Sequence, residues 1–303
     1  MKIRVLLLAA LLAVPVLCIA QATPAQPASP QVKTTLLGGN VYGIDGQGGR
    51  MAALVGPEGI LLVDAQSPAV TQSIVSALKT ISPAPIRFLI NTHVHADHTG
   101  GNENFGKLGV TILGRPNLLD QLVHPVPATN GQIPAPSPAS ALPIILFDNP
   151  VTINLDGETV QLIPLPPSHT NGDTAVKFVK ADVLMTGDVF RSEGFPTPVE
   201  ANGGTIMGLL QSIEKFLEIT GPNTKVVPGH GPVTDRAALV FHREVILTVR
   251  DRVRKAILEG KTLDQVHDAK LTADFEARVG GLPAFINVFV DALYKELKAA
   301  PSR

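Results

Sequence analysis

The sequence contains no tryptophan, and its 303 residues include only 2 tyrosines and 11 phenylalanines. So few aromatic rings argue against a surface on which nucleic-acid bases stack. An excess of charge of one sign is also lacking, because 25 basic residues face 26 acidic ones and the formal net charge is −1. No strong field would therefore attract a nucleic acid or an anionic membrane. We expect a small-molecule substrate and no nucleic-acid partner.

Cysteine is nearly absent as well, and the single one, Cys18, lies in the apolar start of the chain. Two basic residues precede an apolar stretch over residues 5–20, and Ala20-Gln21-Ala22 has the small-x-small pattern of a cleavage site. This arrangement predicts a secretory signal peptide over residues 1–22. Its removal would leave a chain without disulfides, cysteine nucleophiles or thiolate metal ligands.

Two other interpretations of this start are less well supported. A membrane anchor would need a longer apolar run, and Pro15 interrupts the one present. A lipid-modified Cys18 would need a small residue before it, where the sequence has bulky Leu17. We therefore expect an exported protein, periplasmic or secreted, with no stable membrane anchor after cleavage.

The whole sequence has the composition of a globular protein, with 45% hydrophobic and 17% charged residues. Residues 23–33 are rich in proline and alanine, which predicts a flexible leader, and residues 34–303 form the folded domain. Apolar patterning there predicts strands at 35–37, 40–44, 51–55, 60–63, 86–90, 110–113, 151–155, 159–165, 174–179, 183–186 and 226–227. Helices are predicted at 67–81, 115–123, 208–219, 236–258 and 282–297. This order indicates two β-rich layers between helices.

A cluster of histidine and aspartate residues gives the clearest indication of function. His93, His95, Asp97 and His98 lie within six residues, directly after the continuous apolar strand 86–90. Alternate side chains share one side of an extended chain, so His93, His95 and Asp97 would lie on the same side if the strand geometry continued. Burying so many polar groups without a partner is costly, and a divalent cation would offset that cost.

Three later residues follow predicted strands in the same way. His169 comes after strand 159–165, Asp188 after 183–186, and His230 after 226–227. Small residues beside each of them allow the backbone to turn sharply. Nitrogen and oxygen ligands without sulfur suit Zn²⁺, and also iron or manganese.

The segment from Asn91 to Gly101, NTHVHADHTGG, resembles the HxHxDH signature of the metallo-β-lactamase superfamily. The three later residues match the remaining motifs of that superfamily in the right order, and Asp64 resembles its early structural aspartate. The resemblance covers roughly residues 35–235. It implies an α/β fold, an αββα sandwich with two mixed β-sheets flanked by helices and a two-metal site on one edge.

The resemblance also implies the roles of the individual residues. A first metal would be bound by His93, His95 and His169, and a second by Asp97, His98 and His230. Asp188 would bridge the two, and two zinc ions per chain are expected, with iron or manganese as alternatives. A hydroxide held between the metals would be the nucleophile. Asp97 would orient it and pass a proton to the leaving group, which makes Asp97 the candidate catalytic residue.

The implied function is a zinc-dependent hydrolase that cleaves an ester, thioester, lactone or amide-type bond. True β-lactamases of the superfamily carry cysteine or serine where this chain has Asp188, so the sequence looks more like thioesterases and lactonases. Three alternatives stay open: a β-lactam hydrolase, a mononuclear iron persulfide dioxygenase, and a non-catalytic metal-binding protein.

Substrate choice is expected to lie in the loops 45–50, 125–143 and 194–204. We also expect Phe190, Arg191 and Phe195 to line the pocket. His124, His242 and His267 lack the support of a motif and are interpreted as surface or partly buried histidines. The sequence does not indicate an oligomeric state.

Overall fold

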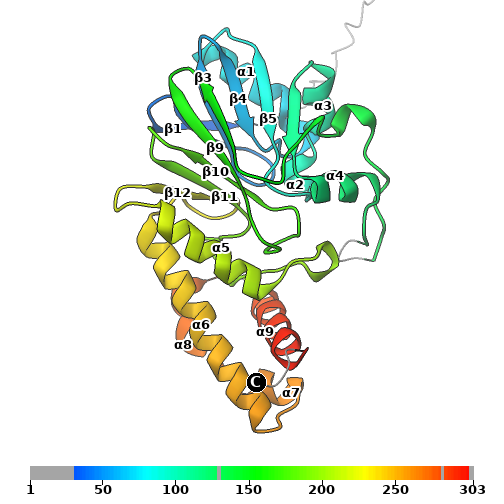
Figure 1. Cartoon of the computed structure of the whole chain (residues 1–303), viewed down its shortest axis with the longest axis vertical. Helices are drawn as coiled ribbons and strands as arrows, with labels where there is room; N and C mark the ends of the chain where they lie inside the picture. The colour runs from blue at the N-terminus through cyan, green and yellow to red at the C-terminus, as the bar shows by residue number, and fades with distance from the viewer. Residues whose placement is uncertain (1–30, 128–130, 281–282, 300–303) are drawn as a thin grey trace, which may run out of the picture.

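Two mixed β-sheets form the centre of the molecule in the computed structural model, which describes residues 31–127, 131–280 and 283–299 (Figure 1). The predicted signal peptide and all but the last residues of the predicted leader lie outside the described residues. The first sheet has the strand order β1-β2-β3-β4-β5-β6-β7. Its antiparallel part contains β1 (Lys33–Gly38), β2 (Val41–Asp45), β3 (Met51–Gly56) and β4 (Gly59–Val63). Its parallel part continues with β5 (Ile86–Ile90), β6 (Thr111–Gly114) and β7 (Ile145–Leu146).

The second sheet has the strand order β12-β11-β10-β9-β8. Its strands are β8 (Val151–Leu155), β9 (Glu158–Pro164), β10 (Thr174–Phe178), β11 (Val183–Gly187) and β12 (Lys225–Pro228). Only the β11–β12 pair is parallel. The β8–β9 hairpin turns through Asp156 and Gly157, both at positive φ, as the Asp-Gly dipeptide predicts.

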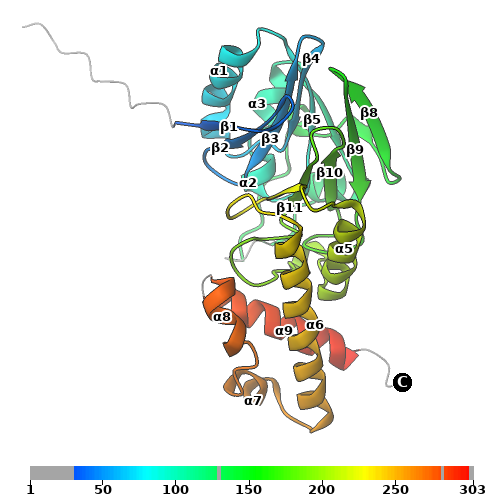
Figure 2. The same ribbon diagram turned by 90° about the vertical axis from the view of Figure 1, so that its left-hand side faces the viewer.

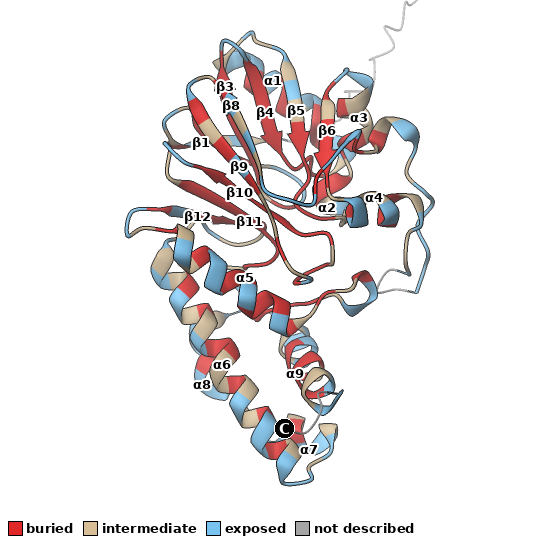
Figure 3. Ribbon diagram, in the orientation of Figure 1, coloured by how far each residue is buried: buried red, intermediate tan, exposed pale blue. Residues whose placement is uncertain are grey.

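Helices cover the outer face of each sheet, which confirms the predicted αββα sandwich (Figures 1 and 2). On the first sheet lie α1 (Thr71–Ile81) and α3 (Asn102–Lys107), with α2 (Ala96–Thr99) and α4 (Pro116–Val123) near the strand ends. The second sheet is covered by α5 (Ile206–Ile219), on which α6 (Arg236–Leu258) and α9 (Pro283–Ala299) pack. Figure 3 shows that the central strands are almost entirely buried. Apolar side chains of both sheets meet between them, among them Leu61, Ile90, Val176 and Met185.

Several short elements differ from the sequence-based expectation. The helices α2 and α3, the strand β7 and the helices α7 (Leu263–Asp268) and α8 (Ala273–Val279) were not predicted. Each is at most seven residues long, too short to show a periodic apolar pattern. Strand β1 begins at Lys33, the last residue of the predicted leader.

The C-terminal helices extend beyond the sandwich, as Figures 1 and 2 show for α6 to α9. Helix α6 has 23 residues, starts at the N-cap Asp235 and is about 35 Å long at the usual rise per residue. Its apolar side packs on α9 through a core that includes Val249, Val253, Phe289 and Leu293. Within the described ranges, no helix combines the length and the hydrophobicity of a membrane span.

His242, on α6, corrects one expectation, because its side chain is fully buried instead of exposed or partly buried. Its ring meets Phe190 edge to face, with 5.1 Å between the ring centroids. Burial lowers the pKa of His242 to about 4. His124, by contrast, is exposed beside Asp120, and His267 is partly buried beside Asp291, as expected.

We predict that the His242→Phe variant loses less stability in acid than the parent chain. The folded state holds the pKa of His242 below the unfolded value of 6.5, so stability is complete above pH 6.5 and falls as the pH drops towards 4. Between pH 7 and pH 4.5 this group should account for about 2 kcal/mol of the loss. Urea unfolding at both pH values measures it; His124→Phe is the exposed control, and an equal acid loss in His242→Phe would contradict the prediction.

Candidate metal centre

The seven candidate ligands lie together where strands of both sheets end. His93, His95, Asp97 and His98 follow β5, and the last two belong to α2. His169 lies in the turn after β9, Asp188 follows β11 directly, and His230 follows β12. The site therefore requires both sheets in their correct relative position.

Three histidines form the first cluster. The distance between His93 Nε2 and His95 Nδ1 is 3.1 Å, and that between His169 Nε2 and His95 Nδ1 is 3.0 Å. The three rings are nearly perpendicular to one another, with interplanar angles of 85° to 89°. Three nitrogen atoms consequently surround one point, in the arrangement of three ligands around a cation.

Neighbouring groups set the tautomer of each ring in this cluster. Thr92 Oγ1 donates to Asp64, so it accepts from His93 Nδ1 at 3.1 Å. His95 Nε2 donates to Asn202 Oδ1 at 3.1 Å, and His169 Nδ1 donates to the carbonyl of Thr197 at 2.6 Å. The remaining nitrogen of each ring keeps its lone pair for the centre.

The second cluster contains Asp97, His98 and His230. His230 Nε2 is 3.0 Å from Asp97 Oδ2, and His98 Nε2 is 3.6 Å from the same oxygen. His98 donates through Nδ1 to Asp64 Oδ2 at 2.8 Å, which directs its other nitrogen towards the cluster. Asp97 is the more exposed carboxylate, so a substrate can reach it.

Asp188 lies between the two clusters. Its Oδ1 is 3.3 Å from His98 Nε2, and its Oδ2 is 3.3 Å from His230 Nε2 and 3.7 Å from His169 Nε2. The carboxylate is buried, with 5% of its side chain exposed. Its position is that of a group able to contact cations in both clusters.

The two clusters have opposite electrostatic character. Burial lowers the pKa values of His93 and His95, and that of His169 to about 4, which favours the neutral form that a metal ligand requires. Hydrogen bonds to Asp188 and Asp97 raise the pKa of His230 to about 9.

In the half of the site that contains the second cluster, neighbouring charges shift the pKa values of His98 and Asp188 in the direction opposite to burial. Burial alone would lower the pKa of His98, but the carboxylates of Asp64 and Asp188 raise it well above its usual range. Burial would raise the pKa of Asp188, but His98 and His230 hold it well below its usual range. In the protein without metal, protons on His98 and His230 therefore supply positive charge, which a bound cation would replace.

The residues fit a bound metal. His98 Nε2 and Asp188 Oδ1 are buried and form no hydrogen bond within the described residues, as expected for atoms that serve as ligands. Two glycines leave the space that the ligands occupy: a Cβ on Gly49 would overlap the His98 ring, and one on Gly229 would overlap Asp188 Oδ1. A nitrogen and oxygen donor set of this kind suits zinc, iron or manganese.

Asp64 has the structural role that the sequence indicated. It is fully buried, adopts a positive φ of 67° directly after β4, and accepts hydrogen bonds from Thr92 N, Thr92 Oγ1 and His98 Nδ1. A carboxylate here thus orients one histidine from each cluster.

The sequence did not reveal three residues that support the ligands. Asn202 and the backbone of Thr197 lie in the predicted loop 194–204, but they hold His95 and His169 instead of a substrate. Gln121 on α4 in turn fixes the amide of Asn202 by accepting from its Nδ2 at 2.7 Å. These contacts span tens of residues and leave no local motif.

The three predicted substrate loops lie near the site. The backbone N–H of Gly49 in loop 45–50 donates to the carbonyl of Asp97 at 3.0 Å. Loop 125–143 lines a cavity of about 240 Å³ beside His95, walled by Val94, Leu122, Pro125, Pro127 and Pro134 among others. Phe195 is a correction, because it stacks on Phe289 in the core at 5.7 Å and lines none of the cavities described here.

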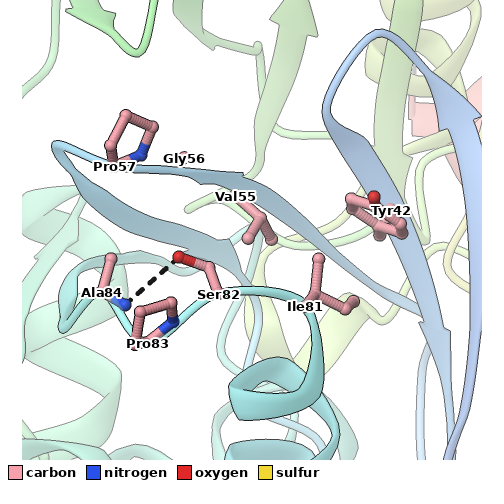
Figure 4. Close-up of a pocket in the computed structure, with 8 residues that line it drawn as sticks. All are labelled: Tyr42, Val55, Gly56, Pro57, Ile81, Ser82, Pro83 and Ala84. Carbon is pink, nitrogen blue, oxygen red and sulfur yellow. Dashed lines mark hydrogen bonds between the residues drawn. The ribbon is translucent and has the colours of Figure 1, made fainter.

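A larger hollow of about 500 Å³ lies elsewhere, between β2, β3 and the end of α1 (Figure 4). Its walls include Tyr42, Val55, Pro57, Ile81 and Pro83, and none of the seven candidate ligands. It is therefore separate from the metal centre.

The family model of the metallo-beta-lactamase superfamily matches residues 45–243. The chain belongs to this superfamily. A metallo-beta-lactamase from Pontibacter korlensis has the same fold, with a TM-score of 0.60 and 17% identity over 72% of this chain and 99% of that one.

Three proteins with assigned names are similar to this chain in sequence, at 25% to 28% identity. The chain is 27% identical to a beta-lactamase-like protein 2 homolog of Caenorhabditis elegans over 58% of its length and 28% identical to the alpha subunit of a 2,4-dinitroanisole O-demethylase of Nocardioides over 53%. It spans about half the length of these two proteins. It is 25% identical to an atrochrysone carboxyl ACP thioesterase of Aspergillus fumigatus, over 84% of this chain and 76% of that protein.

We predict that Gly229→Ala weakens metal binding while the fold persists. The new Cβ would overlap Asp188 Oδ1 and lie 2.9 Å from His98 Cε1, so at least one of the two side chains must move. Metal affinity should fall by about tenfold or more. Competition with a chelator measures it, and far-ultraviolet circular dichroism checks the fold. Gly221→Ala is the matched control, because its Cβ would have only Thr224 Oγ1 nearby, at 3.9 Å; equal affinities would refute the prediction.

Proposed function

We propose that this chain is a zinc-dependent hydrolase with two metal ions, which cleaves an ester, thioester, lactone or amide-type bond in a small molecule. The observation that carries the proposal is the buried Asp188 carboxylate between two complete ligand clusters, 3.3 Å from His98 on one side and 3.3 Å from His230 on the other. A single-metal site would not need a carboxylate shared in this way.

Different residues of the chain would have different roles in hydrolysis. Bound cations would supply Lewis acidity, which lowers the pKa of water and stabilises developing negative charge on a substrate oxygen. Asp64, Asn202 and the Thr197 carbonyl keep the histidine rings in place. The Asp97 carboxylate, near the surface, takes a proton from the attacking water and returns it to the leaving atom.

The type of bond is supported by two features. Asp188 stands where β-lactamases of the superfamily carry cysteine or serine, and a relative that matches most of this chain is named a thioesterase. The cavity beside His95 is mostly apolar and is large enough for an acyl chain of several carbons. We therefore rank thioesters and lactones above β-lactams.

A second candidate has an observation in its favour. His93, His98 and Asp188 also form a group whose ligand atoms converge, two histidines and one carboxylate. Such a set is typical of mononuclear iron oxygenases. A persulfide dioxygenase is therefore the alternative that the first experiment must distinguish.

The experiment measures metal content and activity on the same preparation. We expect about two zinc ions per chain after purification with zinc, and hydrolysis of a thioester or lactone that a chelator abolishes. About one iron per chain with oxygen uptake on a persulfide would replace the proposal with the dioxygenase. Bound metal without turnover of any thioester, lactone, ester or β-lactam would leave a non-catalytic metal-binding protein.

We predict that Asp97→Asn lowers kcat by about 100-fold, because the amide cannot take up a proton in the reaction. Zinc content should decrease far less than activity, since an amide oxygen still replaces one carboxylate oxygen. Steady-state kinetics together with elemental analysis test this. Asp120→Asn on α4, an exposed position, is the control; a loss of zinc in proportion to the loss of activity would show that Asp97 acts only as a ligand.

A further inference from the structure

We propose that the cavity beside His95 binds an uncharged, apolar acyl group of the substrate and limits its length. This inference rests on the proposed function, because it assigns a substrate class to the same site. The cavity has a volume of about 240 Å³, and His95 of the first cluster forms part of its wall. The hollow of Figure 4 and the cleft lined by Phe190 and Arg191 have none of the seven candidate ligands in their walls. A group bound beside His95 therefore lies next to the metal centre.

Three segments and Asn202, all far apart in the sequence, enclose the cavity. The segments are 94–99, which follows β5, 121–127, which includes the end of α4, and 134–137. The backbone N–H of Ser137 donates to the carbonyl of Leu122 at 2.8 Å, which holds the last of these segments against α4. Pro127 and Pro134 are exposed and form the rim, whereas Leu122 is 7% exposed and closes the inner end.

The lining selects an uncharged group. No aspartate, glutamate, lysine or arginine is among the residues that line the cavity. A charged group placed there would lose its hydration without gaining an opposite charge. The free energy of binding therefore favours a group without formal charge.

The polar side chains of the lining are occupied by one another. Asn202 Oδ1 accepts from His95 Nε2 at 3.1 Å, and Asn202 Nδ2 donates to Gln121 Oε1 at 2.7 Å. Gln121 Nε2 donates to Asn171 Oδ1 at 2.7 Å and to the carbonyl of Asn202 at 3.1 Å. Thr99 Oγ1 donates to the carbonyl of His95 at 3.1 Å. A polar ligand would have to break these bonds, whereas an apolar one leaves them intact.

The wall formed by the loop is apolar as well. Pro125, Pro127 and Pro134 have no backbone N–H, so the chain offers no donor at these three positions. Their rings, together with Leu122 and Val126, would contact carbon atoms of a ligand. Burial of aliphatic carbon against this wall is the contribution that stabilises the complex.

The volume of the cavity sets the length of the acyl group. About 240 Å³ equals about eight water molecules of about 30 Å³ each. A methylene group takes up nearly the space of one water molecule, and a bound chain does not fill a cavity completely, so about six carbon atoms fit. The substrate class is then an ester or thioester of a medium-length fatty acid.

Hydrolysis of a series of thioesters tests the proposal. The zinc-loaded full chain receives acetyl, butanoyl, hexanoyl and decanoyl thioesters of the uncharged thiol N-acetylcysteamine. We expect kcat/KM to rise about fourfold per methylene up to hexanoyl and to rise no further for decanoyl. Adipoyl, which has the length of hexanoyl but ends in a carboxylate, should lower kcat/KM by about tenfold or more. Equal values for all chain lengths, or for hexanoyl and adipoyl, would overturn the proposal.

Two variants change the cavity in opposite directions. Val126→Phe fills part of it, so the ratio of kcat/KM for hexanoyl to that for acetyl should fall about tenfold. Leu122→Ala opens the inner end, so decanoyl should gain about tenfold relative to hexanoyl. Val123→Phe is the matched control, because Val123 is partly buried like Val126 but does not line the cavity. If Leu122→Ala fails to fold, the test rests on Val126→Phe, and a ratio there equal to that of the parent chain would contradict the proposal.

A binding measurement separates this proposal from the proposed function. The S-ethyl and S-hexyl thioethers of N-acetylcysteamine lack the carbonyl group, so their calorimetric titration into the zinc-loaded chain needs no turnover. We expect S-hexyl to bind about tenfold or more tightly than S-ethyl, and this difference to be lost in Val126→Phe and kept in Val123→Phe. If no thioester is hydrolysed but this pattern appears, the hydrolase proposal fails and the acyl cavity stands. Thioethers that bind without regard to length, or not at all, would refute the acyl cavity even where thioesters are hydrolysed.

Discussion

The buried carboxylate of Asp188 is the constraint on which the rest of the site depends. A charge so far from water requires compensation on every side. His98, His230 and Arg191 provide it within 3.6 Å, and each comes from a different segment. The glycine at 229 is needed because any side chain there would overlap the carboxylate. The turns at this edge of the sheets therefore bring together the residues that compensate the negative charge of Asp188.

Much of the fold and most of the site could be predicted from the sequence. The long strands have continuous or alternating apolar residues, and the seven candidate ligands stand in motifs that follow strands. The strands and the candidate ligands could therefore both be recognised in the sequence. The supporting residues were not, because Asn202, Thr197 and Gln121 act through contacts between segments far apart in the chain. The burial of His242 also depends on how α6 packs, which a single lone histidine does not reveal.

The two sheets are joined at the site by more than the ligands. Arg50, directly before β3, donates from its backbone N–H to the carbonyl of Gly229 at 2.8 Å and from Nη1 to that of Gly231 at 2.7 Å. These bonds connect the loop 45–50 to the turn that carries His230. Since cations would contact ligands from both sheets, their binding would stabilise the sandwich by favouring the folded state.

The separation of the C-terminal helices from the ligands has an evolutionary consequence. All seven candidate ligands precede residue 231, and the family match ends at residue 243, before α7, α8 and α9 begin. Mutations in these helices therefore replace none of the candidate ligands, although Phe285 of α9 contacts Arg191, which lies beside Asp188. Sequence change in α7 and α8 can therefore accumulate in evolution while the residues that form the two clusters stay the same.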